Sequence, residues 1–219
     1  MALTFNGTAN TIAGLAVGGL PDGTVDNDSI ANTTIAAGKL ASGVGGKVLQ
    51  VVQTVKKDTF STATVNTGAN NTDLSYMTDV TGLNVTITPT NGSTKILLSW
   101  HISYSADRYC AGIIRRKVGS ASAAILTGAN ATTSGNRPGV AFTIGGNEGA
   151  TDNNLDKRTT AGSYLDAHGQ TDTLIYNIAV GSTNTTDPEL TINRADFNDE
   201  NNAYNNISTS TLTVIEFSS

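Results

Sequence analysis

Apolar residues recur at every fifth position in the N-terminal part of the chain. The series is Leu15, Leu20, Val25, Ile30, Ile35 and Leu40. Most of the residues between them are Gly, Ala, Ser, Thr, Asn or Asp. A step of five residues sends successive side chains around an α-helix, and it sends them to alternate faces of a β-strand. Neither element would therefore collect this series into one apolar stripe.

Three structures are compatible with the five-residue period. A coil of the pentapeptide type buries its core by stacking many turns, and the series is too short to supply them. A flexible linker has a similar composition, and its apolar residues would then be in phase by chance. In the third structure, identical chains wrap around one another and the apolar residues of each chain meet their copies. We favour this oligomeric shaft for residues 1–46.

Beyond Gly46 the pattern changes to the two-residue alternation of half-buried β-strands. Alternation covers residues 83–87, stops at the turn sequence PTNGS and resumes over residues 96–104. It returns over residues 174–180, and apolar runs near residues 48–55 and 211–217 predict further strands. No stretch has the spacing of an amphipathic helix. About eight to ten short strands predict an all-β fold, a jelly-roll-like β-sandwich head over residues 47–219.

Two polar stretches are longer than ordinary connections between strands. They are GGNEGATDNNLDKRTTAGSYLDAHG, residues 145–169, and RADFNDENNAYNN, residues 194–206. Loops of such length are often functional, and exposed aromatic rings beside amides and carboxylates suit contacts with sugars. The candidates for surface recognition are Tyr164, Asp166, His168, Phe197, Asp199 and Tyr204.

The composition restricts the class of partner. Charged residues make up 14% of the chain, which has a net charge of −5. A disordered chain usually carries more charge, and a nucleic-acid-binding surface needs a basic stripe, so we expect a folded protein that binds no nucleic acid. The chain has no run of about 20 apolar residues, so we expect no insertion into a membrane. The N-terminus lacks the pattern of a signal peptide, so we expect synthesis in a cytoplasm.

The sequence offers no clear catalytic or metal-binding motif. It has no P-loop, GxSxG or HExxH, and the single Cys110 excludes an intramolecular disulfide. The acidic groups at residues 22–28 and 196–200 do not have the spacing of an EF-hand, although they leave a calcium ion open. His101 is expected on a strand surface, and Arg115 on the solvent side of a strand or in a salt bridge between subunits. We expect no enzyme activity, no cofactor and no metal.

Several stretches resemble a known family. GTVDNDSIANTTIAAGKLASG is similar to the DGSITTAKIADGAVTTAKLA type of repeat in bacteriophage tail fibres and related virion appendages. KVLQVVQTVKKDTFST, DVTGLNVTITPTNGSTKILLSWHIS and the closing STLTVIEF resemble a head domain of marine-phage fibre proteins. The resemblance runs from about residue 20 to the C-terminus, but it does not extend to the middle of the chain.

The resemblance implies a homotrimer with an N-terminal shaft and an outward β-sandwich head. In this interpretation the five-residue series locks three chains together, and the N-terminus binds another virion protein. The head would bind a glycan or protein on the host cell surface. The expected location is the virion, either in a tail fibre or on the capsid surface.

Two alternatives remain open from the sequence. The same trimer could be a capsid decoration or head-fibre protein that stabilises or ornaments the shell. A glycan-degrading tail enzyme is a third interpretation, and it would require a cluster of carboxylates in a groove. The chain has 219 residues, which is short for a complete long tail fibre.

Overall fold

The computed structural model describes residues 4–6, 11–13, 48–66, 73–106, 109–144, 157–183, 190–195 and 206–218. The chain divides into two compact units, Met1–Gly45 and Gly46–Ser219. In the first unit, strands β1 (Thr4–Asn6) and β2 (Thr11–Ala13) pair antiparallel. The five-residue series from Leu15 to Leu40 lies outside the described residues.

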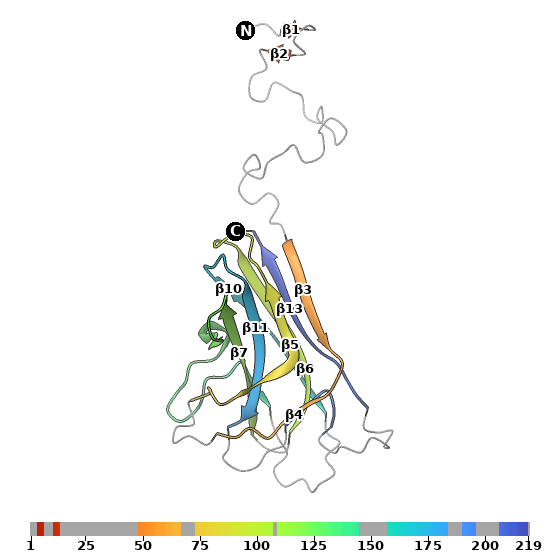
Figure 1. Ribbon diagram of the computed structural model, residues 1–219, viewed down its shortest axis with the longest axis vertical. Coiled ribbons are helices and arrows are strands. Elements are labelled where there is room, and N and C mark those ends of the chain that lie inside the picture. The colour runs from red at the N-terminus through yellow and green to blue at the C-terminus, as the bar shows by residue number, and fades with distance from the viewer. Residues whose placement is uncertain are drawn as a thin grey trace. The chain divides into compact units, whose positions relative to one another are not determined.

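The second unit contains two antiparallel sheets (Figure 1). In the first sheet the long strands lie in the order β3 (Val48–Lys56), β13 (Ser210–Phe217), β6 (Lys95–Ala106) and β10 (Arg158–Asp166). The short strands β4 (Phe60–Thr62) and β12 (Leu190–Ile192) pair with each other, and β12 also pairs with the last residues of β6. They extend the positions of β3 and β13.

The second sheet is built in the same way. Its long strands lie in the order β5 (Thr78–Ile87), β11 (Leu174–Ser182) and β7 (Cys110–Val118). Two short strands, β8 (Ala124–Ile125) and β9 (Phe142–Ile144), pair with the other edge of β7. The single 3₁₀ turn among the described residues, η2 (Thr127–Ala129), lies in the connection between them.

The strand order is that of a jelly roll. Three pairs of strands, β3 with β4, β8 with β9 and β12 with β13, can each be treated as one position in a sheet. This leaves eight positions along the chain. The first sheet then has the order 1-8-3-6 and the second has the order 2-7-4-5. This double Greek key defines the jelly-roll sandwich. The predicted all-β class is confirmed, and no α-helix occurs among the described residues.

The core lies between the two sheets and follows the predicted alternation. Residues Leu83, Val85 and Ile87 of β5 are at most 2% exposed. The inward side of β6 and β11 is equally buried, and includes Leu98, Ile102, Leu174, Tyr176 and Ile178. Side chains of both sheets belong to one continuous apolar cluster. His101 points to the other side of β6 and is exposed, as predicted.

The chain also covers the outer face of the second sheet. Ile113 and Ala179 point away from the core, yet both are 0% exposed. Leu74 and Met77, from the segment before β5, pack against them in a second apolar cluster. Burial of these side chains holds the irregular segment before β5 against the sheet.

One prediction about the middle of the chain is wrong. Residues 145–169 were expected to form one long loop, but Arg158–Asp166 forms β10, which pairs with β6 over its whole length. An alternating apolar pattern is absent here because β10 is an edge strand whose inward positions include Thr160, Gly162 and Tyr164. Gly162 lies opposite Trp100, where a Cβ atom would come within 2.4 Å of the indole ring.

We therefore expect Gly162→Ala to destabilise the head by about 1–3 kcal/mol, because the added methyl group collides with the buried Trp100 ring. The measurement is the free energy of unfolding from urea denaturation. Ser163→Ala, on the exposed side of the same strand, should change it by less than about 0.5 kcal/mol. Equal effects of the two substitutions would contradict the packing described here.

Candidate functional site

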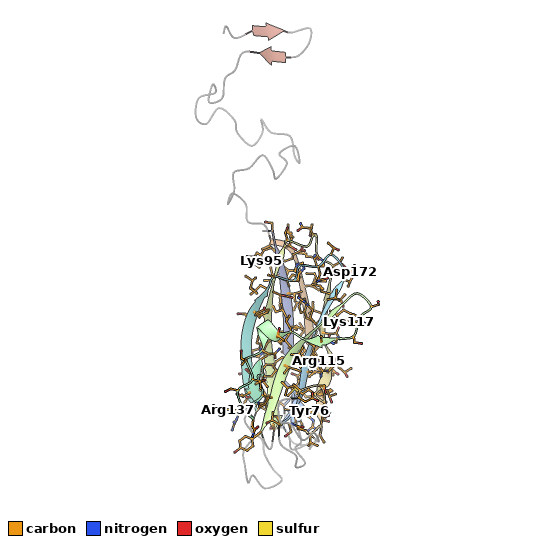
Figure 2. All side chains as sticks on the ribbon, turned by 90° about the vertical axis from the view of Figure 1, so that its left-hand side faces the viewer. Tyr76, Lys95, Arg115, Lys117, Arg137 and Asp172 are labelled. Atoms are coloured by element: carbon orange, nitrogen blue, oxygen red, sulfur yellow. The ribbon has the colours of Figure 1, made fainter. Side chains whose placement is uncertain are left out.

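We name the two ends of the sandwich after the strands that begin at them. At the β3 end, β3 begins at Val48 next to the end of β13 at Phe217, and β5 turns into β6 (Figure 1). At the β7 end, β6 ends at Ala106 and β7 begins at Cys110. Figure 2 places Lys95 and Asp172 at the β3 end, with Tyr76 and Arg137 toward the other end.

Tyr164 lies on the inward side of β10 and is partly buried against the core. Its ring reaches η2, where a Cβ atom on Gly128 would lie only 2.0 Å from the phenolic oxygen. The close approach needs a glycine at position 128. Tyr164 therefore fastens β10 to the turn at Thr127–Ala129, and its ring is half-buried in the described structure.

Asp166 is 3% exposed and forms a buried ion pair. Its Oδ2 accepts hydrogen bonds of 2.7 Å from Arg116 Nη1 and from the Tyr176 hydroxyl. Burial raises the pKa of Tyr176, and the neighbouring Asp166 charge raises it further. The phenol therefore stays protonated and donates. These contacts join β10 to β7 and β11, across the two sheets.

His168 belongs to a second buried cluster at the β3 end. Its Nδ1 accepts a hydrogen bond from the Gln170 amide, which places the proton of a neutral ring on Nε2. Nε2 lies 3.2 Å from Thr94 Oγ1, and that hydroxyl donates to Glu216 Oε1 at 2.6 Å. The histidine therefore donates to the hydroxyl rather than removing its proton. With His168 3% exposed, this is not an open nucleophile and base.

Glu216 is the centre of this cluster and is 0% exposed. Besides Thr94, its carboxylate accepts hydrogen bonds from the backbone N–H and the hydroxyl of Thr90 and from Gln50 Nε2. Burial alone would raise the pKa of Glu216, but the hydrogen bonds outweigh burial and hold it below its usual value. The ionised side chain thus ties β13 to β3 and to the turn between β5 and β6.

The other three candidates, Phe197, Asp199 and Tyr204, lie outside the described residues. The residues on either side of them are described. Asn193 has a left-handed φ of 68°, which Asn tolerates better than most residues. Its amide donates to the carbonyls of Lys56 and Asp58, both at 2.9 Å. Its own carbonyl accepts the Ser208 N–H at 2.8 Å, so residues 193 and 208 meet.

The six candidates therefore do not share one described surface. Asp166 and His168 are inside the head, contrary to the exposed positions expected for them, because the carboxyl and imidazole groups have buried partners. Alternation could not reveal this, since a polar residue at a strand end carries no sign of its partner. The residues on either side of Phe197, Asp199 and Tyr204, by contrast, lie near the β7 end, where the Asn193 N–H donates to the Ser103 carbonyl.

Arg115 is settled by its contacts. Its Nη1 lies 3.0 Å from Asp79 Oδ1, and Nη2 donates to the Leu74 and Ser75 carbonyls. Arg115 therefore lies on the outer side of β7, the side expected for it, and its ion pair with Asp79 lies within the chain. It holds the segment before β5 against β7.

Two hollows share Thr127 in their linings. One of about 270 Å³ includes Arg116 and Ser122 in its lining, and one of about 350 Å³ includes Leu74 and Asn130. No cluster of metal ligands occurs among the described residues. The described part of the chain also holds no helix long and apolar enough to cross a membrane.

Comparison with known proteins shows no matching family model and no matching curated protein. Among solved structures, the chain is similar to one of infectious bursal disease virus, Gt strain, with 11% identity over 78% of this chain and a TM-score of 0.35. A Gx strain structure gives 10% identity over 77% of this chain and a TM-score of 0.34. The chain spans 38% and 40% of those chains. The jelly-roll assignment depends on the strand order alone.

The Glu216 cluster generates a pH prediction. The pKa of Glu216 is lower in the folded head than in the unfolded chain, so the ionised carboxylate stabilises the folded head. This stabilisation is present above the ordinary pKa of 4.5 and is lost as the pH falls through the lower value of the folded head. We expect Glu216→Gln to destabilise the head by about 1–3 kcal/mol at pH 7, because buried donors lose a charged acceptor.

The difference in Tm between the wild-type chain and Glu216→Gln should shrink as the pH falls below 4.5. Thermal melting from pH 7 to pH 2.5 measures it. Asp172→Asn, an exposed carboxyl at the same end, serves as the control and should leave the wild-type profile unchanged (Figure 2). A difference that stays constant with pH would contradict an ionised Glu216.

Proposed function

We propose that this chain is a homotrimeric fibre protein of a bacteriophage virion that presents its jelly-roll head to the host cell surface. One observation carries the proposal: a segment with a five-residue apolar period leads directly into β3, the first strand of a jelly roll. One copy of that segment has no regular element in which its apolar residues form a stripe. Identical copies supply the missing contacts.

The head is suited to binding rather than chemistry. The buried polar groups at the β3 end fasten strand ends, and Thr94, His168 and Glu216 are oriented in a way that does not activate the hydroxyl. The proposal therefore includes no catalytic residue. Three heads on one shaft would add weak single contacts through multivalency.

Recognition is proposed for the β7 end of the head. The Asn193 and Ser208 contacts close the base of residues 194–207, which include Phe197, Asp199 and Tyr204. A polar segment with aromatic residues, held at both of its flanks by the fold, can contact a glycan without loss of stability in the sandwich. The N-terminus would bind another virion protein, and the proposed location is the virion.

Assembly is tested by the mass of the full chain in solution. Light scattering should give the mass of three chains of 22.5 kDa each. Val25→Asp combined with Ile30→Asp should lower that mass toward one chain, since charges would replace the contacts between copies. Thr33→Asp, outside the five-residue series, is the control. A monomeric wild-type chain would contradict the shaft.

Attachment is tested with the fluorescent full-length chain on a panel of bacterial cells and on purified phage capsids. Binding to cells, weakened about a hundredfold or more in the monomeric double variant, is expected if three heads bind together. Phe197→Ala and Tyr204→Ala should weaken it, whereas Tyr164→Phe should not. Binding to capsids alone would instead favour the decoration or head-fibre function.

A further inference from the structure

The outer face of the first sheet carries a row of aliphatic side chains. The strand registers place Val51, Ile215, Leu97 and Leu165 side by side, one on each of β3, β13, β6 and β10. All four point away from the core. Val51 is 57% exposed and Leu165 is 48% exposed, while Leu97 and Ile215 are partly exposed.

The two outer faces of the sandwich differ in how far residues of the same chain cover them. Ile113 and Ala179, on the outer face of the second sheet, are covered by Leu74 and Met77 of the same chain. The row on the first sheet stays exposed in the single chain. An aliphatic row that crosses a whole sheet is the kind of surface that soluble proteins usually cover with a partner.

The charges on this face favour another copy of the same chain as that partner. The chain has a net charge of −5 and contains 18 acidic residues. Yet the outward positions of these strands, over their described lengths, hold no Asp or Glu beside the aliphatic row, where the neighbours include Gln53, Ser99 and Thr213. Copies of an acidic face would repel one another, whereas the outward positions of this face hold one charged side chain, Lys95, at the β3 end.

The path of the chain supports the same partner. The five-residue apolar series ends at Leu40, and β3 begins at Val48 after seven further residues. The start of β3 carries the exposed Val48, Leu49 and Val51. Copies held together by that segment would bring their β3 strands close to one another. A partner of different sequence would need a separate reason to meet a face without acidic residues on the strand that follows the N-terminal segment.

We propose that the outer face of the β3–β13–β6–β10 sheet packs against its copies around the three-fold axis of the trimer, with Leu97 and Ile215 at the contact. This inference rests on the proposed trimer. It adds a second contact between chains, in the head itself, and it leaves the β7 end and the outer face of the second sheet free for other partners.

Leu97→Asp is the first test. It should raise the concentration at which the full-length trimer dissociates by about tenfold or more, because like charges would meet in an apolar contact. Ile175→Asp is the matched control: Ile175 is also partly exposed, and it occupies a middle strand on the outer face of the other sheet. The control should leave the dissociation of the trimer unchanged.

Leu97→Cys provides a test that does not depend on destabilising the head. Copies of Leu97 that meet near an axis can form a disulfide between two chains, which appears as a dimer on a non-reducing gel. Ile175→Cys should give none, and the native Cys110 is buried. Circular dichroism checks that each variant is folded.

The outcomes separate this inference from the proposed function. A wild-type chain that is monomeric would overturn the trimer and this interface with it. A wild-type trimer that tolerates Leu97→Asp and yields no cross-link through Leu97→Cys would overturn the interface alone. The N-terminal segment would then hold the three chains together by itself.

Discussion

The structure depends on the pairing of β6 with strands from distant parts of the chain. β6 pairs along one edge with β13 and β12 and along the other with β10. Its inward residues, including Trp100, fill the core between the sheets. Pairing between distant strands requires long loops of the chain to close first. The entropy lost in that closure slows folding. The Glu216 and Asp166 clusters then connect the ends of β13 and β10 to neighbouring elements through hydrogen bonds.

The buried carboxylates of this head connect its strands to one another. Asp166 connects β10 to β7 and β11, and Glu216 connects β13 to β3 and the β5–β6 turn. Buried charges are costly unless they are hydrogen-bonded, and here each carboxylate has several donors. The described polar clusters therefore explain how the strands of the sandwich are held together, and the recognition proposed above is assigned to the surface of the head.

Much of the fold could be predicted from the sequence, because alternation over residues 83–87, 96–104 and 174–180 directly reflects burial on one side of a strand. β10 could not be predicted, since an edge strand with Gly162 opposite Trp100 shows no apolar pattern. The candidate site was harder still. Asp166 and His168 look like loop residues, and only partners from distant parts of the chain, Arg116 and Thr94 among them, account for their burial.

The left-handed Asn193 has a consequence for how the head can diversify. β12 and β13 occupy one strand position beside β6, and the contacts of Asn193 with Ser208 and Ser210 reconnect the backbone across the interruption. Contacts among described residues therefore hold both flanks of this interruption in place. If the segment between Ala195 and Asn206 carries the recognition proposed above, a lineage could exchange it for one of another length or chemistry and change what the head binds while keeping the same scaffold.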